Sequence, residues 1–186
     1  MTEWFAPAAA LVCAAILDAC IGDPRWLPHP VRWIGNGALR LEPVFRRWFG
    51  PRERLAGIAC AATVDALAAG GAIGAVWLAG AWHPVAGFAV TVIAVHFSIA
   101  AGDLAFHARR VHRALEQDGL EAGQKAVSFM VGRDTTVLDE TGVVRACIES
   151  VGENMTDGVL AAVFFAVLGG LAGGLPGMAC GAMFYR

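Results

Sequence analysis

Charged residues are scarce in this sequence, and their scarcity is the first guide to its class. Only 16% of its 186 residues are Asp, Glu, Lys or Arg, against about 25% in an average soluble domain. Hydrophobic residues make up 57% of the chain, and the mean hydropathy is +0.58. This composition is typical of a protein that lies in a lipid bilayer. The net charge of −2 gives no reason to expect nucleic acid as a partner.

Other absences narrow the class further. The sequence has no internal repeat and no low-complexity linker, so we interpret residues 1–186 as a single membrane domain or part of one. Its five cysteines show no C-x-x-C spacing and four of them lie in apolar runs, which favours small buried side chains over metal ligands or disulfides. No G-x-x-x-x-G-K-[ST] motif is present, so a nucleotide site would be of an unconventional kind.

Four apolar segments are long enough, or nearly so, to cross a bilayer, which takes about 20 helical residues. They are residues 4–21, 58–81, 85–101 and 159–184. A turn at Trp82, His83 and Pro84 should join the second and third into a hairpin, because proline disfavours helical geometry in the residue before it. In the fourth segment Pro176 is flanked by glycines, which is compatible with either a re-entrant turn or a straight span. The sequence thus predicts an all-α, polytopic membrane protein with about four transmembrane segments.

The polar segments predict how the chain is oriented. Residues 22–54 and 102–158 contain seven and six Lys or Arg, and none occurs before the first span or in the predicted hairpin turn. By the positive-inside rule both polar loops face the cytoplasm and the N-terminus lies outside. The first segment lacks the basic start of a signal peptide, so we interpret it as a span. We expect a multi-pass protein of the cell (inner) membrane.

The first polar loop contains two features. Its basic run is interpreted as a contact with anionic lipid headgroups; the run consists of Arg40, Arg46, Arg47, Arg52 and Arg54. Ahead of it, three prolines within residues 24–30 predict a rigid extended segment. His29 in this segment is a candidate general base or ligand contact, although a lone histidine is more often structural. Asp18, about a turn inside the membrane, needs a partner or a function, and Arg25 or Arg32 is a possible partner.

The second polar loop should be largely helical. Residues 103–116 are amphipathic, and Gly119 separates them from a second short helix over 120–130. Gly132 predicts a turn, and Thr136 with Asp139 forms a capping-box pattern that places the start of the next helix near Val137. A helix start beside Arg133 would be an anion site. Arg133 is alternatively a structural partner of Asp134 or Asp139.

Within that next helix, Arg145, Glu149 and Glu153 lie at spacing four and share one face. Asp157 would extend the stripe if the helix continues, and Asn154 adds a neutral oxygen ligand. Hard oxygen donors at this density suit Mg²⁺ bridging to a phosphate. The alternative is a solvated acidic face in which Arg145 pairs with Glu149.

These motifs, in this order and spacing, resemble the CobD/CbiB family of cobalamin biosynthesis. The resemblance rests on residues 22–25, 28–31, 132–135, 138–139, 144–146, 149–151, 153–154 and 157–158. It implies a polytopic membrane ligase that joins (R)-1-amino-2-propanol, or its phosphate, to adenosylcobyric acid to give adenosylcobinamide or its phosphate. Family members run to about 300 residues, so this chain resembles an N-terminal portion. It departs from the family pattern at Gly152, Met155 and residues 162–165.

Amide formation needs an amine, an activated carboxylate and, if ATP activates it, neutralisation of phosphate charge. We therefore expect Mg²⁺ and ATP as cofactors, and a corrinoid and aminopropanol (phosphate) as substrates. Lipid, further copies of the chain or other enzymes of the pathway are the expected partners. The candidate catalytic residues are Asp23, His29, Arg133, Asp134 and Glu149; the candidate substrate-binding residues are Arg25, Arg32, Thr135, Arg145 and Asn154; the candidate metal ligands are Glu149, Glu153 and Asp157. Two alternatives are a Mg²⁺-dependent prenyl-diphosphate membrane enzyme and a non-catalytic or truncated relative.

Overall fold

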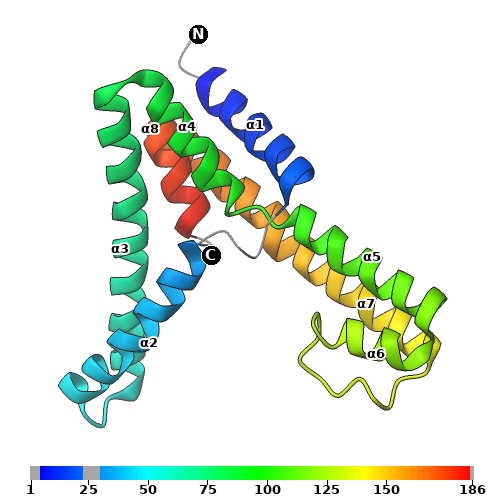
Figure 1. The fold of residues 1–186 in the computed structure, drawn as a ribbon. Helices are drawn as coiled ribbons and strands as arrows, with labels where there is room; N and C mark the ends of the chain where they lie inside the picture. Colours follow the sequence, from blue (N-terminus) through cyan, green and yellow to red (C-terminus); the bar gives the residue numbers. More distant parts are fainter. Residues whose placement is uncertain (1–4, 23–29, 185–186) are drawn as a thin grey trace.

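A computed structural model describes residues 5–22 and 30–184 of the chain. In these residues all regular secondary structure is helical, with no strand, which confirms the all-α prediction (Figure 1). By length and composition, three helical stretches can cross a membrane: Glu53–Trp82, Pro84–Asp118 and Glu140–Ala182. The helix Phe5–Ile21 is shorter and also apolar. Three of the candidate site residues, Asp23, Arg25 and His29, lie outside the described residues.

Four helices form a bundle: α1 (Phe5–Ile21), α3 (Glu53–Trp82), α4 (Pro84–His96) and α8 (Ala162–Phe184). Its inner contacts use mostly small side chains, such as Ala10, Ala14 and Ala166, none of which is exposed. Large apolar side chains point outward instead, and Trp77 on α3 is 66% exposed. Lipid tails are as apolar as leucine, so helices in a bilayer associate through small residues and leave large ones facing lipid. The bundle therefore has the surface of a membrane domain.

The predicted turn between the second and third apolar segments is confirmed. α3 ends at Trp82, His83 is extended with φ −158°, and α4 begins at Pro84. Proline suits the first position of a helix because its missing N–H has no partner there in any case. The His83 ring also accepts a hydrogen bond at Nδ1 from the Val85 N–H, at 3.2 Å. These contacts end one helix and start the next within a single residue.

α8 turns back on itself in the middle. Gly173 and Gly174 leave helical geometry, and Gly174 has φ +61°, which favours glycine. The two halves of α8 then lie so close that a Cβ on Gly177 would overlap the backbone of Gly169. Figure 1 shows the orange half rising and the red half returning beside it. The fourth segment is therefore not one straight helix, because the chain reverses direction at these two glycines.

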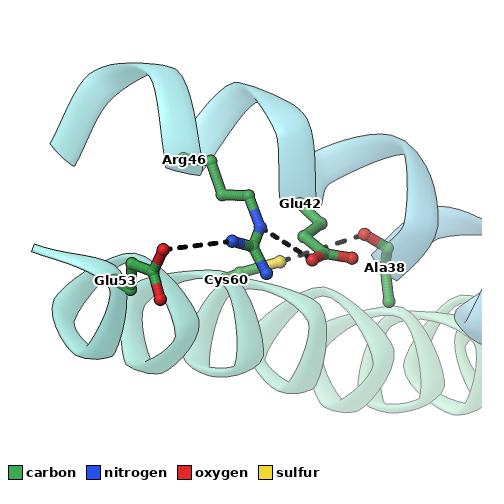
Figure 2. Close-up of polar contacts among 5 residues, drawn as sticks. All are labelled: Ala38, Glu42, Arg46, Glu53 and Cys60. Atoms are coloured by element: carbon green, nitrogen blue, oxygen red, sulfur yellow. Dashed lines mark hydrogen bonds and ion pairs between the residues drawn. The ribbon is translucent and has the colours of Figure 1, made fainter. Parts of the chain in front are cut away.

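One helix in the first polar loop was not predicted. α2 (Pro30–Phe49) lies against α3, and Pro30 occupies the first helical position. Figure 2 shows the contact: Arg46 bonds Glu42 at 2.9 Å, its guanidinium lies 3.8 Å from Glu53, and Cys60 Sγ lies 4.0 Å from the Ala38 carbonyl oxygen. The hydrogen bond to Glu42, followed by the two negative charges, raises the pKa of Arg46. Arg46, predicted to contact lipid headgroups, therefore already has carboxylate partners within the chain.

The second polar loop forms an arm that extends from the bundle (Figure 1). It consists of α5 (Ala101–Asp118), α6 (Leu120–Val127) and α7 (Glu140–Met155). The two helices predicted on either side of Gly119 are confirmed, and Gly119 has φ +85°. The arm has a core of its own, made of Val111, Ala126, Val127, Val143 and Ala146. It is therefore a folded unit and not a flexible loop.

The arm is fixed to the bundle at two places, the junction of α4 with α5 and the junction of α7 with α8. The third apolar segment is helical only to His96, and α5 follows after a short break. Asp18 of α1 accepts a hydrogen bond at Oδ2 from the Gly102 N–H, at 2.8 Å, which caps the start of α5. On the other side, α7 passes through a π-helical turn, η2 (Thr156–Ala161), directly into α8. Asp18, the carboxylate predicted to lie inside the membrane, thus has a structural role in orienting the arm.

Candidate functional site

α7 begins at Glu140, so the predicted start near Val137 is wrong by three residues. Asp139 is the N-cap, and its carboxylate accepts from the Gly142 N–H at 2.7 Å. Thr136, the residue expected to cap, instead donates from its hydroxyl to Asp134 at 2.7 Å. Both residues are short polar side chains able to cap a helix, and local hydrogen bonding decided between them. The first turn of α7 is occupied by a carboxylate of the chain itself, so the predicted anion site does not form there.

Arg133 lies beside the middle of α7 and not at its start. Its Nη2 is 3.1 Å from Oε2 of Glu149. Glu149 is ten residues beyond the N-cap, about 15 Å along the helix axis. Glu149 also lies 3.8 Å from Nε of Arg145, so one carboxylate contacts two arginines. The partner of Arg133 is therefore Glu149, and not Asp134 or Asp139 as the alternative interpretation proposed.

The loop between α6 and α7 is held by hydrogen bonds from three side chains, of which Gln124 was not predicted. The amide nitrogen of Gln124 donates to the carbonyl oxygens of Thr136 and Leu138, at 3.1 and 2.7 Å. In return the hydroxyl of Thr135 donates to the Gln124 carbonyl at 2.9 Å. The hydroxyl of Ser150 on α7 donates to Met130 at 2.9 Å. Thr135 is buried in this arrangement, so it positions the loop and lines neither of the pockets described below.

Asp134, a candidate catalytic residue, is held in its ionised form. Its carboxylate accepts from both the hydroxyl and the backbone N–H of Thr136, and these two bonds lower its pKa. A lowered pKa makes a carboxylate a weaker proton acceptor at neutral pH. The contribution of this turn to stability is present above the ordinary aspartate pKa of 3.8 and is lost as the pH falls below it. The geometry favours a structural role for Asp134 over proton transfer.

A pocket of about 310 Å³ lies between this loop and α7, and we call it the Arg133 pocket. Its charged lining residues are Arg133, Glu149 and Glu153, and Val131 and Gly132 contribute the loop side. The side chain of Glu153 makes no hydrogen bond or ion pair within the described part of the chain. The pocket thus combines a guanidinium, a carboxylate already paired with it, and a carboxylate that is available.

A second pocket, of about 200 Å³, lies between α5 and α7, and we call it the His107 pocket. Asp103 and His107 line it from α5, with 3.6 Å between Oδ1 and Nε2. Asn154 lines it from α7, and its amide nitrogen donates to Ser150 at 2.8 and 3.2 Å. Asp103 and His107 were not among the predicted site residues, although their spacing of four within a predicted amphipathic helix places them on one face.

The two pockets adjoin, because Met130 and Ser150 line both. The π-helical turn lies at the inner end of the His107 pocket, where the Gly158 carbonyl accepts from the Ala100 N–H at 3.1 Å. A π turn widens the helix, releases a carbonyl from the regular ladder and is frequent at functional sites. Here the Gly158 carbonyl bonds Ala100, and so links the end of α7 to the break between α4 and α5.

The predicted metal stripe is interrupted by the same turn. Asp157 lies within η2, where the wider helix no longer keeps a spacing of four on one face. Among the described residues, no three His, Cys, Asp or Glu side chains converge as a metal site. Glu149, Glu153 and Asp157 therefore do not form a ready-made three-carboxylate centre. A single carboxylate together with a substrate phosphate is a common way of holding Mg²⁺, and Glu153 fits that arrangement.

The remaining candidates lie outside these pockets. Arg145 is exposed on α7 and contacts the site only through Glu149. Arg32 is exposed on α2, which packs on α3, and it lines neither pocket. The pockets therefore bring together Arg133, Glu149, Glu153 and Asn154 from the predicted set.

The fold and the pockets define a helical membrane protein that carries a polar site on an arm beside its bundle. The family model described as "CobD/Cbib protein" matches residues 11–186. The chain belongs to this family.

Three relatives illustrate the match, and each is named "Cobalamin biosynthesis protein CobD". Those of Geobacter metallireducens and Pelobacter propionicus are 40% and 39% identical over 162 and 165 residues. That of Clostridium perfringens is 36% identical over 160 residues. The matches cover 87%, 89% and 86% of this chain but 51% of each relative. The chain thus spans about half the length of the curated relatives it matches, and no solved structure matches it.

Proposed function

We propose that the protein acts in cobalamin biosynthesis, in the attachment of (R)-1-amino-2-propanol or its phosphate to adenosylcobyric acid. The observation that carries the proposal is the placement of the family motif. Residues 130–158 supply most of the walls of two adjoining polar pockets at the edge of an apolar bundle. The relatives are named for cobalamin biosynthesis. Their matches cover 86% or more of this chain, which is enough to include this stretch.

In this proposal Arg133 binds an anionic group of the substrate. Guanidinium groups form paired hydrogen bonds to carboxylate or phosphate oxygens. Glu149 holds Arg133 at 3.1 Å before the ligand arrives, so the guanidinium is already oriented toward the pocket. An arriving anion would share or replace that contact. Asn154 supplies a neutral polar group on the neighbouring face.

Mg²⁺ and ATP are part of the proposal as expected cofactors. Glu153 is the residue that would hold Mg²⁺ together with a substrate phosphate, and the ion would neutralise phosphate charge when bound. The residues described here show no feature that identifies a nucleotide site, so we assign none to ATP. Lipid, other copies of the chain and other enzymes of the pathway remain proposed partners.

Complementation tests the proposal. A strain blocked between cobyric acid and cobinamide would receive this chain, a version extended to the length of the relatives, and the extended version with Arg133→Ala. We expect the extended version to restore growth. In a separate measurement of amide-forming turnover, Arg133→Ala should lower the rate by about 100-fold or more, because a preorganised donor to substrate charge is lost.

Arg47→Ala is the matched control, because Arg47 is exposed on α2 away from both pockets. Its turnover should stay within about twofold of the unmodified protein. Wild-type turnover in Arg133→Ala would contradict the assigned site, and failure of the extended version to restore growth would contradict the proposed function.

A further inference from the structure

The His107 pocket holds a cluster of hydrogen-bond acceptors suited to a small cation. Asp103 supplies a carboxylate, and its side chain is 47% exposed. The His107 side chain is 17% exposed, and its Nδ1 is buried without a hydrogen-bond partner among the described residues. On α7 the Asn154 amide nitrogen is used by Ser150, which leaves the amide oxygen available as an acceptor. Phe129 adds an aromatic wall.

We propose that this pocket binds the primary amine of the substrate as an ammonium group. An ammonium has three N–H donors and no acceptor, so it needs a site made of acceptors and a negative charge. Asp103 would supply the charge, and a ring nitrogen of His107 and the Asn154 oxygen would accept the other hydrogens. Phe129 contributes only an apolar wall, because the Arg110 guanidinium already lies over its ring, 4.9 Å from the centroid. This assignment rests on the proposed function, because it takes the amine from the substrate named there.

The position of the pocket supports a ligand that is positive at one end and negative at the other. The His107 and Arg133 pockets share Met130 and Ser150, and on α7 their polar residues alternate between neighbouring faces. An amino-alcohol phosphate placed across the shared wall would direct its amine toward Asp103 and its phosphate toward Arg133. Glu149 and Glu153 also line the Arg133 pocket, so the orientation of such a ligand rests on two specific contacts, of its phosphate with Arg133 and of its amine with Asp103, and not on a net charge difference between the pockets.

The same helix offers a matched control pair. His112 and Glu116 on α5 have the same spacing as Asp103 and His107, and Nε2 of His112 lies 3.5 Å from Oε2 of Glu116. Their side chains are 68% and 62% exposed, and neither lines the pocket. Substitutions in this pair change the same charges on the same helix without changing the proposed site.

The experiment compares two ligands that differ only in the amine. (R)-1-amino-2-propanol O-phosphate and isopropyl phosphate would be titrated calorimetrically into the chain in lipid nanodiscs. The variants are Asp103→Asn, His107→Gln, Glu116→Gln and His112→Gln. We expect the unmodified chain to bind the amine ligand at least about tenfold more tightly, because hydrogen bonds to charged groups are stronger than neutral ones.

Asp103→Asn should remove this preference while leaving the affinity for isopropyl phosphate unchanged, which also shows that the variant is folded. His107→Gln should reduce the preference in part. Glu116→Gln and His112→Gln should keep it.

Equal affinity for the two ligands in the unmodified chain, or a preference that survives Asp103→Asn, would overturn the amine site and leave the Arg133 pocket and the proposed function standing. If the unmodified chain binds neither ligand, the amine site and the phosphate site are both overturned. A preference lost in Asp103→Asn, with no growth in the complementation assay, would support the amine site and contradict the proposed function alone.

Discussion

Glu149 shows why a single residue in this site is better explained by binding than by stability. It contacts Arg133 at 3.1 Å and Arg145 at 3.8 Å, and its side chain is 51% exposed. Exposed ion pairs contribute about 0–1 kcal/mol to stability, because both partners are well solvated when apart. Such a cluster adds little to the fold. It does keep a guanidinium oriented at the mouth of a pocket.

Gln124 should have a larger effect on local order than any of these charges. Its amide donates to two loop carbonyls, so Gln124→Ala removes two hydrogen bonds between α6 and the loop. We expect residues 128–139 to lose about 1–2 kcal/mol of protection, since a typical hydrogen bond contributes about 1 kcal/mol. Hydrogen–deuterium exchange measured on the loop peptides checks this expectation.

Gln117→Ala is the control for that measurement, because Gln117 is exposed on α5 and makes no side-chain hydrogen bond within the described residues. Its loop should exchange at the unmodified rate. Equal exchange in the two variants would show that Gln124 does not hold the loop.

At the scale of elements, α8 depends on glycine more than any other helix. Gly169, Gly177 and Gly181 each bring backbone against backbone where a Cβ has no room. The hydrophobic stretch before the turn, residues 159–172, is about 21 Å long as a helix, shorter than the roughly 30 Å of a bilayer core. A straight crossing is therefore replaced by a hairpin within the bundle.

Gly177→Ala should destabilise this hairpin by about 1–3 kcal/mol, because the added methyl group overlaps the backbone of Gly169. The measurement is the thermal unfolding midpoint of the detergent-solubilised chain. Gly70→Ala in α3 is the matched control, since nothing lies within 4 Å of its Cβ position and alanine favours a helix. A midpoint in Gly177→Ala equal to that of Gly70→Ala would rule out the tight packing of α8.

At the scale of the whole molecule, the chain separates an apolar bundle from a polar arm. The α3–α4 turn lies at the same end of the bundle as the start of α1, and the arm leaves from the other end (Figure 1). The positive-inside rule would place the arm in the cytoplasm. The polar site would then lie beside the membrane and not within it.

Single-cysteine labelling tests this arrangement in a background without the five native cysteines. With a membrane-impermeant maleimide, Ala81→Cys should react from outside and Glu121→Cys only from the cytoplasmic side. Ala172→Cys, next to the turn of α8, should resist labelling from both sides if the turn is re-entrant, because such a turn does not emerge from the membrane. Labelling of Ala172→Cys from outside as fast as Ala81→Cys would indicate a full crossing.

The sequence by itself determined the features that depend on local pattern. Long apolar runs gave the membrane helices, proline after His83 gave the turn between two of them, and Gly119 divided the two helices of the arm. These features need only hydrophobic periodicity and the conformational limits of proline and glycine. The polar residues of the family motif were likewise recognisable from spacing, and several of them line the Arg133 pocket.

Only the tertiary structure decided which of these residues meet. Thr136 bonds Asp134, so Asp139 caps α7 in its place. Arg133 lies beside Glu149, in the middle of α7 and not at its start. The pairing of Asp18 with Gly102 and the joining of the His107 pocket to α7 link residues far apart in the chain. Such contacts depend on how helices pack, which spacing along one chain does not encode. For that reason the sequence identified the motif, and the fold determined the site that the motif builds.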